Sequence, residues 1–216
     1  MKYEAVLLDM DGTVLDTLED LTDAVNAALR EFGLPAVEEG KVRASLGNGA
    51  ARLIQCCAPE DCGQARREQV LAWYKPYYDA HCRIKTRPYQ GIVPMMERLK
   101  AQGVKLAIIS NKPDPAVKEL AAAFFPGLLD SAVGESETVR RKPDPDAVLT
   151  AAEQLGVSRE KCVYVGDSEV DVMTAKNAGM DGIAVSWGFR DVDWLEAHGA
   201  EKIARSAEEL EHFITA

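Results

Sequence analysis

The hydrophobic positions along the chain form two kinds of pattern: short apolar runs, and longer stretches in which apolar residues recur at helical spacing. The run at residues 3–9 is typical of a buried strand, because most of its positions are apolar. Comparable runs predict four more strands, at 104–109, 128–134, 161–167 and 182–187. Helical spacing predicts helices between 87 and 104 and at 116–125, 143–156, 168–179 and 206–214. Such alternation predicts an α/β fold, with a Rossmann-like parallel-sheet core and helices on both faces.

The segment between the first strand and residue 87 has a different character. Apolar residues recur at helical spacing from residue 18, and Gly33 followed by Pro35 ends this helix. Thr17 and Asp20 have the spacing of a capping box. The rest, to about residue 84, has helical patterns and no convincing strand. We therefore predict two domains, an α/β core formed by 1–15 and 87–216 and an inserted α-helical domain formed by 16–86.

Composition and charge narrow the class of partner. The chain has 216 residues, of which 47% are hydrophobic and 28% charged, as in a globular protein with a core. Its net charge of −10 argues against nucleic acid and anionic membranes as partners. No secretory leader is recognisable and no apolar stretch reaches the roughly 18 residues of a membrane helix, so we expect a cytoplasmic protein. Both a monomer and a homodimer are compatible with the sequence.

The cysteines give no pattern that points to a function. There are five, an odd number, and Cys56, Cys57, Cys62 and Cys82 fall in one segment near His81. Zinc could be bound by such a group, but the spacing matches no regular zinc motif. We expect reduced, half-buried thiols.

Polar residues follow three of the predicted strands directly. Because ligands bind outside the carboxyl ends of parallel strands, we expect these side chains to lie on one rim of the sheet. Lys142 precedes the helix between the third and fourth strands, and Asp171 lies one helical turn beyond the fourth. The residues that follow the strands themselves are Asp9, Asp11, Gly12 and Thr13 after the first, Ser110 and Asn111 after the second, and Asp167 after the fourth.

Each of these features has an ordinary structural explanation when it is taken singly. The segment from Asp9 to Gly12 could be a turn, the polar residues after the other strands could cap helices, and Lys142 could be a solvated charge. An EF-hand calcium loop is excluded, because its glycine and its final glutamate are not in the required positions. Their occurrence together at strand ends favours one site.

The chemistry of such a site follows from its charges. Carboxylates gathered on one rim repel each other and need a cation. A small number of hard oxygen ligands suits Mg²⁺, which keeps waters that a phosphate can replace. Lys142 and Ser110 would donate to phosphoryl oxygens. Mg²⁺ and Lys142 together would make the site locally positive inside an acidic protein, as an anionic substrate requires.

These residues resemble the motifs of the haloacid dehalogenase-like (HAD) hydrolase superfamily, in order and over essentially the whole chain. The first motif is DxDGT, here residues 9–13, and the second is a serine after the second strand, here Ser110. The third is a lysine, Lys142 in "RRKPDP", and the fourth is GDxxxD, with Asp167 and Asp171. The helical insertion resembles the small helical cap of the phosphoglycolate phosphatase branch.

The resemblance implies a Mg²⁺-dependent phosphatase that hydrolyses a small phosphate monoester through an aspartyl phosphate. Asp9 would be the nucleophile, and Asp11 would protonate the leaving oxygen and then activate water. For the first step Asp11 has to hold a proton near neutral pH, which neighbouring negative charge favours. Mg²⁺ would lie on a carboxylate oxygen of Asp9, the backbone carbonyl of Asp11 and a carboxylate of Asp167. Asp171 would order its waters or ligate it weakly.

The same resemblance implies the groups that hold the phosphate. Ser110, Lys142 and the backbone N–H groups near Gly12, Thr13 and Asn111 would bind the phosphoryl oxygens, so that catalysis is mainly positioning and electrostatic stabilisation.

The inserted domain carries a segment that resembles the GNGA sequence of phosphoglycolate phosphatases. A glycine-flanked loop before a helix presents N–H groups that suit a small carboxylate or hydroxyl. We therefore expect Gly47, Asn48 and Gly49 to contact the end of the substrate that lacks the phosphate.

The expected partner is a small phosphorylated metabolite, with phosphoglycolate as the leading substrate. Pyrophosphatases, nucleotidases and sugar phosphatases belong to the same branch and stay open as alternatives. Asp11 argues against dehalogenation, and Thr13, where sugar phosphomutases usually carry valine, favours hydrolysis over mutase chemistry. A receiver-type signalling module gathers similar residues around Mg²⁺, but it would have adjacent acids after the first strand and no cap.

Overall fold

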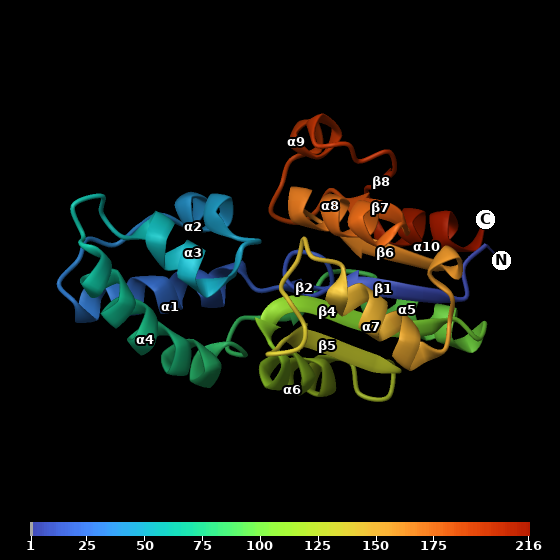
Figure 1. Ribbon diagram of the computed structural model, residues 1–216, viewed down its shortest axis with the longest axis horizontal. Helices are drawn as coiled ribbons and strands as arrows, with labels where there is room; N and C mark the ends of the chain where they lie inside the picture. Colours follow the sequence, from blue (N-terminus) through green and yellow to red (C-terminus); the bar gives the residue numbers. More distant parts are fainter. Residues whose placement is uncertain (1) are drawn as a thin grey trace. The chain divides into compact units, whose positions relative to one another are not determined.

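The computed structural model describes residues 2–216 and is shown in Figure 1. The chain divides into two compact units, of which the first is formed by Met1–Leu15 and Pro88–Ala216 and the second by Asp16–Arg87. In the described part of the chain, no helix combines the length and the apolar character that crossing a membrane requires.

The first unit is built on a six-stranded sheet with the order β5-β4-β1-β6-β7-β8, in which every neighbouring pair is parallel. The predicted parallel α/β fold is therefore confirmed. The last strand was not predicted, because two residues make too short an apolar run to be recognised. The strands are β1 Ala5–Asp9, β4 Lys105–Pro113, β5 Ser131–Glu135, β6 Cys162–Gly166, β7 Asp181–Val185 and β8 Ile203–Ala204.

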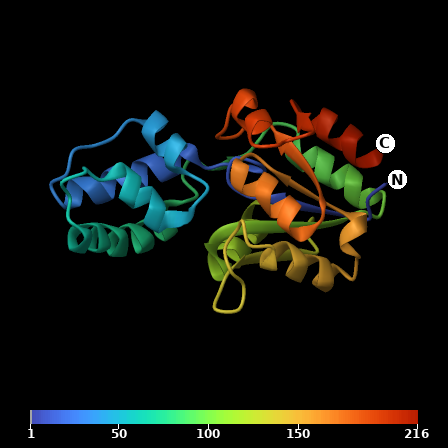
Figure 2. The ribbon, with the colours of Figure 1, turned by 45° about the horizontal axis from the view of Figure 1, so that its top comes forward.

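Strand β1 lies in the middle of the sheet, and all five of its residues are buried. Side chains alternate between the faces of a strand, so Ala5 and Leu7 point to one side, where they join the hydrophobic cluster beneath α7 (Asp146–Leu155) and α8 (Glu169–Ala178). Helices α5 (Ile92–Ala101) and α10 (Ala207–Thr215) pack against each other on the opposite side (Figures 1 and 2). The sheet is covered on both faces, as its near-continuous apolar strands require. The unit also contains α6 (Asp114–Phe124), the 3₁₀ turn η1 (Arg159–Lys161) and α9 (Val192–Ala197).

Helix α7 begins later than the sequence indicates. The apolar pattern predicts this helix at 143–156, but Pro145 is the N-cap and the helix starts at Asp146. Asp144 accepts a hydrogen bond from the backbone N–H of Asp146, at 3.3 Å, and pairs with Arg140 at 2.7 Å. The side chain of Asp144 thus forms an Asx-type turn with the backbone N–H two residues further on, just before the helix begins.

The second unit contains helices α1 (Leu18–Glu31), α2 (Glu39–Ser45), α3 (Gly49–Cys57) and α4 (Gln64–His81). The short strands β2 (Leu15–Asp16) and β3 (Arg87–Pro88) pair with each other where the chain passes between the units. All five cysteines of the chain are free thiols. The expectation that they are half-buried holds only for Cys56, because the other four are buried.

Asp20 has a different role from the one that its spacing indicates. Thr17 precedes α1 but its side chain makes no capping hydrogen bond, so the predicted capping box is wrong. The carboxylate of Asp20 is 3% exposed and accepts from the backbone N–H groups of Lys85, at 3.0 Å, and Thr86, at 2.8 Å. A carboxylate near the start of one helix therefore holds the segment that ends the helical unit.

We predict that Asp20→Ala lowers the free energy of unfolding of the helical unit by about 2–4 kcal/mol, because it leaves buried N–H donors without their acceptor. The matched control is Asp23→Ala on the same helix, since Asp23 is exposed and pairs with Lys85 at 2.8 Å. That change should cost at most about 0.5 kcal/mol. Urea denaturation with hydrogen exchange at Lys85 and Thr86 measures both, and equal costs for the two variants would contradict the assignment.

Candidate active site

The candidate site lies where the strand order of the sheet reverses. From β1 the chain continues to β4 and β5 on one side, and later to β6, β7 and β8 on the other. Asp9 ends β1, Ser110 lies in the last part of β4, and Asp167 directly follows β6. In an open parallel sheet this reversal creates a crevice at the carboxyl ends of the strands.

Lys142 is the centre of the polar contacts in this crevice. Its ammonium lies 2.7 Å from Oδ1 of Asp9 and 2.8 Å from Oδ1 of Asp171, and it donates to the hydroxyl of Tyr164 at 3.0 Å. The side chain is only 4% exposed. Burial alone would lower the pKa of Lys142, but the two carboxylates outweigh it and raise that pKa, so the ammonium stays charged.

The two carboxylates on Lys142 differ in their own surroundings. Burial and the charge of Asp171 raise the pKa of Asp9 well above its ordinary value, although Lys142 opposes them. Burial also acts to raise the pKa of Asp171, but Lys142 and the hydrogen bonds from Ser168 and Tyr164 lower it. Those bonds come from the Ser168 hydroxyl at 2.6 Å, the Ser168 N–H at 3.2 Å and the Tyr164 hydroxyl at 2.8 Å. Asp171 is therefore the fully paired anion and Asp9 the one with least compensation.

Asp167 completes the carboxylate group. It accepts from the Phe189 N–H at 2.7 Å and from the Thr13 hydroxyl at 3.2 Å, and it is 1% exposed. Burial and the charge of Asp171 raise its pKa to about 7. Within residues 2–216 the carboxylates of Asp9, Asp167 and Asp171 are the one set of potential ligands close enough to hold a metal ion, with an oxygen of each within 4.8 Å of the others. Hard oxygen donors short of positive charge suit a divalent cation such as Mg²⁺.

Three glycines let the backbone approach these carboxylates. At Gly12, which has φ of +80°, a Cβ would lie 2.3 Å from Oδ2 of Asp167. At Gly188 it would lie 2.3 Å from Cβ of the same aspartate, and at Gly166 it would lie 2.2 Å from Cβ of Asp171. Any side chain at these positions would displace a carboxylate, so the packing itself demands glycine.

Asp11 and Ser110 lie beside a second lysine. The ammonium of Lys112 is 2.9 Å from Oδ1 of Asp11, and the Lys112 N–H donates to the hydroxyl of Ser110 at 3.2 Å. The carboxylate of Asp11 is not part of the metal-ligand set formed by Asp9 and its neighbours. Asp11 therefore has a cationic neighbour in Lys112, and its role as the proton donor stays a prediction.

Asn111 acts on the loop that carries Lys142. Its Oδ1 accepts from the Lys142 N–H at 2.7 Å, and its Nδ2 donates to the Lys142 carbonyl at 3.2 Å. The amide side chain therefore holds both backbone groups of Lys142. Binding of phosphate by the backbone near Asn111 stays a prediction.

The remaining candidates, Gly47, Asn48 and Gly49, belong to the helical unit. Asn48 is the N-cap of α3, and both glycines have positive φ, 102° and 78°. These values explain why glycine occupies both positions. A contact between this loop and a substrate stays a prediction.

Sequence reasoning assigned no role to Tyr164, Lys112, Gly188 or Phe189. Tyr164 lies within an apolar strand, where the sequence indicates that an aromatic residue packs in the core. Alternation along β6 and its register with Leu7 on β1 place it on the face of α8, one row behind Asp9. Lys112 directly follows the candidate residues Ser110 and Asn111, and this position could have indicated that it belongs to the site. Gly188 and its neighbour give none, because their contact with Asp167 joins segments far apart in the chain.

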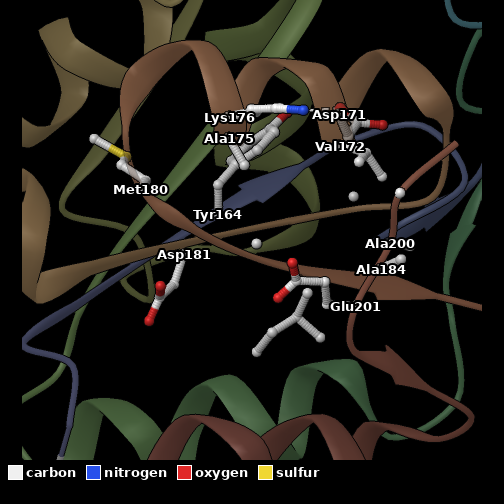
Figure 3. A pocket seen from close by; sticks show the side chains of 14 residues that line it. Tyr164, Asp171, Val172, Ala175, Lys176, Met180, Asp181, Ala184, Ala200 and Glu201 are labelled. Atoms are coloured by element: carbon white, nitrogen blue, oxygen red, sulfur yellow. Dashed lines mark hydrogen bonds between the residues drawn. The ribbon is translucent and has the colours of Figure 1, made fainter.

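A cavity of about 250 Å³ lies next to the carboxylate group, in the same unit (Figure 3). Tyr164 and Asp171 form part of its wall, together with Lys176, Met180 and Glu201. Neither Asp9 nor Lys142 lines it. The cavity therefore reaches the carboxylate group on the side of Asp171 and Tyr164, and does not include the nucleophile candidate Asp9.

Comparison with known proteins identifies the class to which this fold and site belong. The model of the haloacid dehalogenase-like hydrolase family matches residues 6–185. The chain belongs to this family, and this membership decides against the receiver-type module.

Similar proteins in the family include a phosphoglycolate phosphatase of Xanthomonas campestris pv. campestris, which is 35% identical over 191 residues, or 86% of this chain and 84% of that protein. The N-acetylmuramic acid 6-phosphate phosphatase of Pseudomonas aeruginosa is 31% identical over 215 residues, or 97% of this chain and 94% of that protein. A crystal structure of a proposed phosphoglycolate phosphatase from Lactobacillus delbrueckii subsp. bulgaricus superimposes with a TM-score of 0.94 at 43% identity, covering 99% of each chain.

The raised pKa values predict how stability depends on pH and metal. Asp167 has a pKa of about 7 in the folded, metal-free protein and an ordinary value of 3.8. A carboxyl group whose pKa is raised by folding stabilises the folded state while it is protonated, and this contribution is lost as the pH rises through about 7. Above this pH the buried, ionised carboxylates destabilise the folded state, and a cation bound to them would offset this effect. We expect the rise in Tm on adding Mg²⁺ to be larger at pH 7.5 than at pH 5 by at least about 5 °C.

Differential scanning calorimetry at constant ionic strength measures this difference. Asp167→Asn, which cannot ionise, should reduce both the pH dependence and the response to Mg²⁺. The exposed Asp181, which pairs with Lys2 at 2.6 Å, supplies the control variant Asp181→Asn, and it should leave both unchanged. A rise in Tm that is equal at the two pH values would contradict the assignment of the site.

Proposed function

We propose that this chain is a Mg²⁺-dependent phosphoric monoester hydrolase that acts on a small phosphorylated metabolite through an aspartyl phosphate at Asp9. The proposal is carried by the contacts of one buried lysine, Lys142. Its ammonium lies 2.7 Å from Asp9, at the end of β1, and 2.8 Å from Asp171, in the first turn of α8. The contact with Lys142 fixes the orientation of the Asp9 carboxylate at the carboxyl end of the strand. The four motifs of the family supply every group that the reaction needs.

Mg²⁺ is proposed on the carboxylates of Asp9 and Asp167, with the backbone carbonyl of Asp11 as a further ligand and Asp171 ordering its waters. The raised pKa values of Asp9 and Asp167 support this, since they mark anions that lack a full counter-charge. When bound, the ion would neutralise these carboxylates and stabilise the charge on the phosphoryl oxygens.

The first chemical step is proposed to be attack of an Asp9 carboxylate oxygen on phosphorus. A bond forms between that oxygen and phosphorus while the bond from phosphorus to the alcohol oxygen breaks, and Asp11 gives its proton to that oxygen. Asp9 is held for this attack through Oδ1, which accepts from Lys142 at 2.7 Å and from the Met10 N–H at 2.7 Å.

The second step returns the enzyme to its starting state. Asp11 takes a proton from a water molecule, whose oxygen attacks phosphorus and releases the carboxylate of Asp9 and inorganic phosphate. Ser110, Lys142 and the N–H groups near Gly12, Thr13 and Asn111 are proposed to hold the phosphoryl oxygens through both steps.

The leading substrate class is a short phosphate ester of a hydroxy acid, with 2-phosphoglycolate as its simplest member. Support comes from the relatives named phosphoglycolate phosphatase, of which the Xanthomonas protein is 35% identical. The relative named for N-acetylmuramic acid 6-phosphate supports a second candidate, an amino-sugar acid phosphate, because its alignment covers 97% of this chain. Both names describe phosphate monoesters of molecules that carry a carboxylate.

We predict that Asp9→Asn lowers Mg²⁺-dependent phosphate release from 2-phosphoglycolate by at least about 10³-fold, because an amide cannot serve as the nucleophile. The measurement is phosphate release from 2-phosphoglycolate, pyrophosphate, sugar phosphates and nucleoside monophosphates. Asp181→Asn, an exposed aspartate outside the motifs, should keep the wild-type rate. Release that survives in Asp9→Asn would rule out an aspartyl phosphate at this residue.

We also propose that Gly47, Asn48 and Gly49 contact the non-phosphate end of the substrate. The variant Asn48→Ala should then change the order of preference among those esters, while release from the best substrate falls less than in Asp9→Asn. Specificity constants for each ester measure this. An unchanged order of preference would remove the loop from substrate recognition.

A further inference from the structure

We propose that Lys112 recognises a second anionic group on the substrate, so that the α/β unit itself selects phosphate esters whose alcohol carries a carboxylate close to the ester oxygen. This inference rests on the proposed function and narrows its substrate class. It gives the core a specificity-determining residue of its own, in addition to the loop around Asn48.

The position of Lys112 carries the inference. Its ammonium is 2.9 Å from Oδ1 of Asp11, the group proposed to give its proton to the leaving oxygen. A proton donor lies within about 2.6–3.2 Å of the oxygen that it protonates. Lys112 therefore lies on the leaving-group side of the reaction, whereas Lys142 contacts the nucleophile.

The backbone explains why a lysine on β4 reaches this place. The regular pairing of β4 with β5 ends at Ile109 and resumes only at Pro113, so the segment from Ser110 to Lys112 departs from the regular register. Such irregularities re-aim side chains and are common beside active sites. The hydrogen bond from the Lys112 N–H to the Ser110 hydroxyl, at 3.2 Å, fixes the lysine relative to a proposed phosphate ligand.

The surroundings of Lys112 favour recognition of an anion. Its side chain is 12% exposed and that of Asp11 is 20% exposed, so the pair is largely shielded from water. Contacts between charges are stronger in such a partly buried place than at the surface. A lysine ammonium has three N–H donors and can serve more than one carboxylate. Lys142 does so here, with Asp9 and Asp171 both within 2.8 Å of its nitrogen.

The geometry of the substrate fits this placement. In 2-phosphoglycolate the carboxylate oxygens are three covalent bonds from the ester oxygen, so a group next to the proton donor is within reach of them. A neutral alcohol of the same size would leave the ammonium without this contact.

The test compares two esters of similar size at saturating Mg²⁺ and fixed ionic strength. They are 2-phosphoglycolate and 2-hydroxyethyl phosphate, whose alcohol part carries a neutral hydroxyl in place of the carboxylate. The quantity measured is the ratio of their kcat/KM values. In the wild type it should exceed about tenfold, and Lys112→Met should lower it by at least about tenfold, mainly through KM for 2-phosphoglycolate, as expected for one lost charged hydrogen bond. Lys112→Arg keeps the charge and should hold the ratio within about threefold of the wild type.

The control variant is Lys118→Met, an exposed lysine on α6 that pairs with Asp114 at 2.7 Å, and it should leave both rates unchanged. If Lys112→Met lowers the rates with the two esters by the same factor, Lys112 only holds Asp11 in place and the inference is overturned. A wild-type ratio near one also overturns it. If the wild type releases phosphate from no ester, the proposed function itself fails, and the inference fails with it.

Discussion

The site depends on one buried cation between two carboxylates. Lys142 contacts Asp9 and Asp171, which come from the end of the central strand and from the start of α8. Removing the ammonium would leave two buried anions close together, a cost of several kcal/mol by the usual penalty for breaking such a group. The Asn111 side chain forms hydrogen bonds with both the N–H and the carbonyl of Lys142. The loop that supplies the lysine is therefore held through its backbone as well as through the lysine side chain.

The difference between the two anions follows from how each is supported. Asp171 receives hydrogen bonds from Tyr164 and Ser168 as well as from Lys142, and its pKa is lowered. Asp9 lacks this support, and its pKa is raised. An arrangement that satisfies one carboxylate and leaves the other short of positive charge suits a cation site and a reactive oxygen. The close approach of Gly166 to Asp171 keeps the supporting carboxylate in place.

The sequence predicted the parts of the site that depend on local order. Asp9 and Asp167 could be placed because each follows a recognisable apolar strand, and parallel strands end on one edge. The contacts of Tyr164 and Gly188 could not, because they depend on which distant segments become neighbours. Asp20 illustrates the same limit, since its spacing from Thr17 indicates a cap while its actual partners lie 65 and 66 residues away.

The formal charge of the site bears on how an acidic protein receives an anionic substrate. Four carboxylates, Asp9, Asp11, Asp167 and Asp171, lie with two lysines. With Asp11 holding the proton that the first step requires, a divalent cation would bring the formal charge of these groups to only about +1. Directed donors therefore have to supply most of the attraction to a phosphate dianion. A second anionic group on the substrate would then depend on a particular cation rather than on the net charge, and Lys112 is the cation beside Asp11.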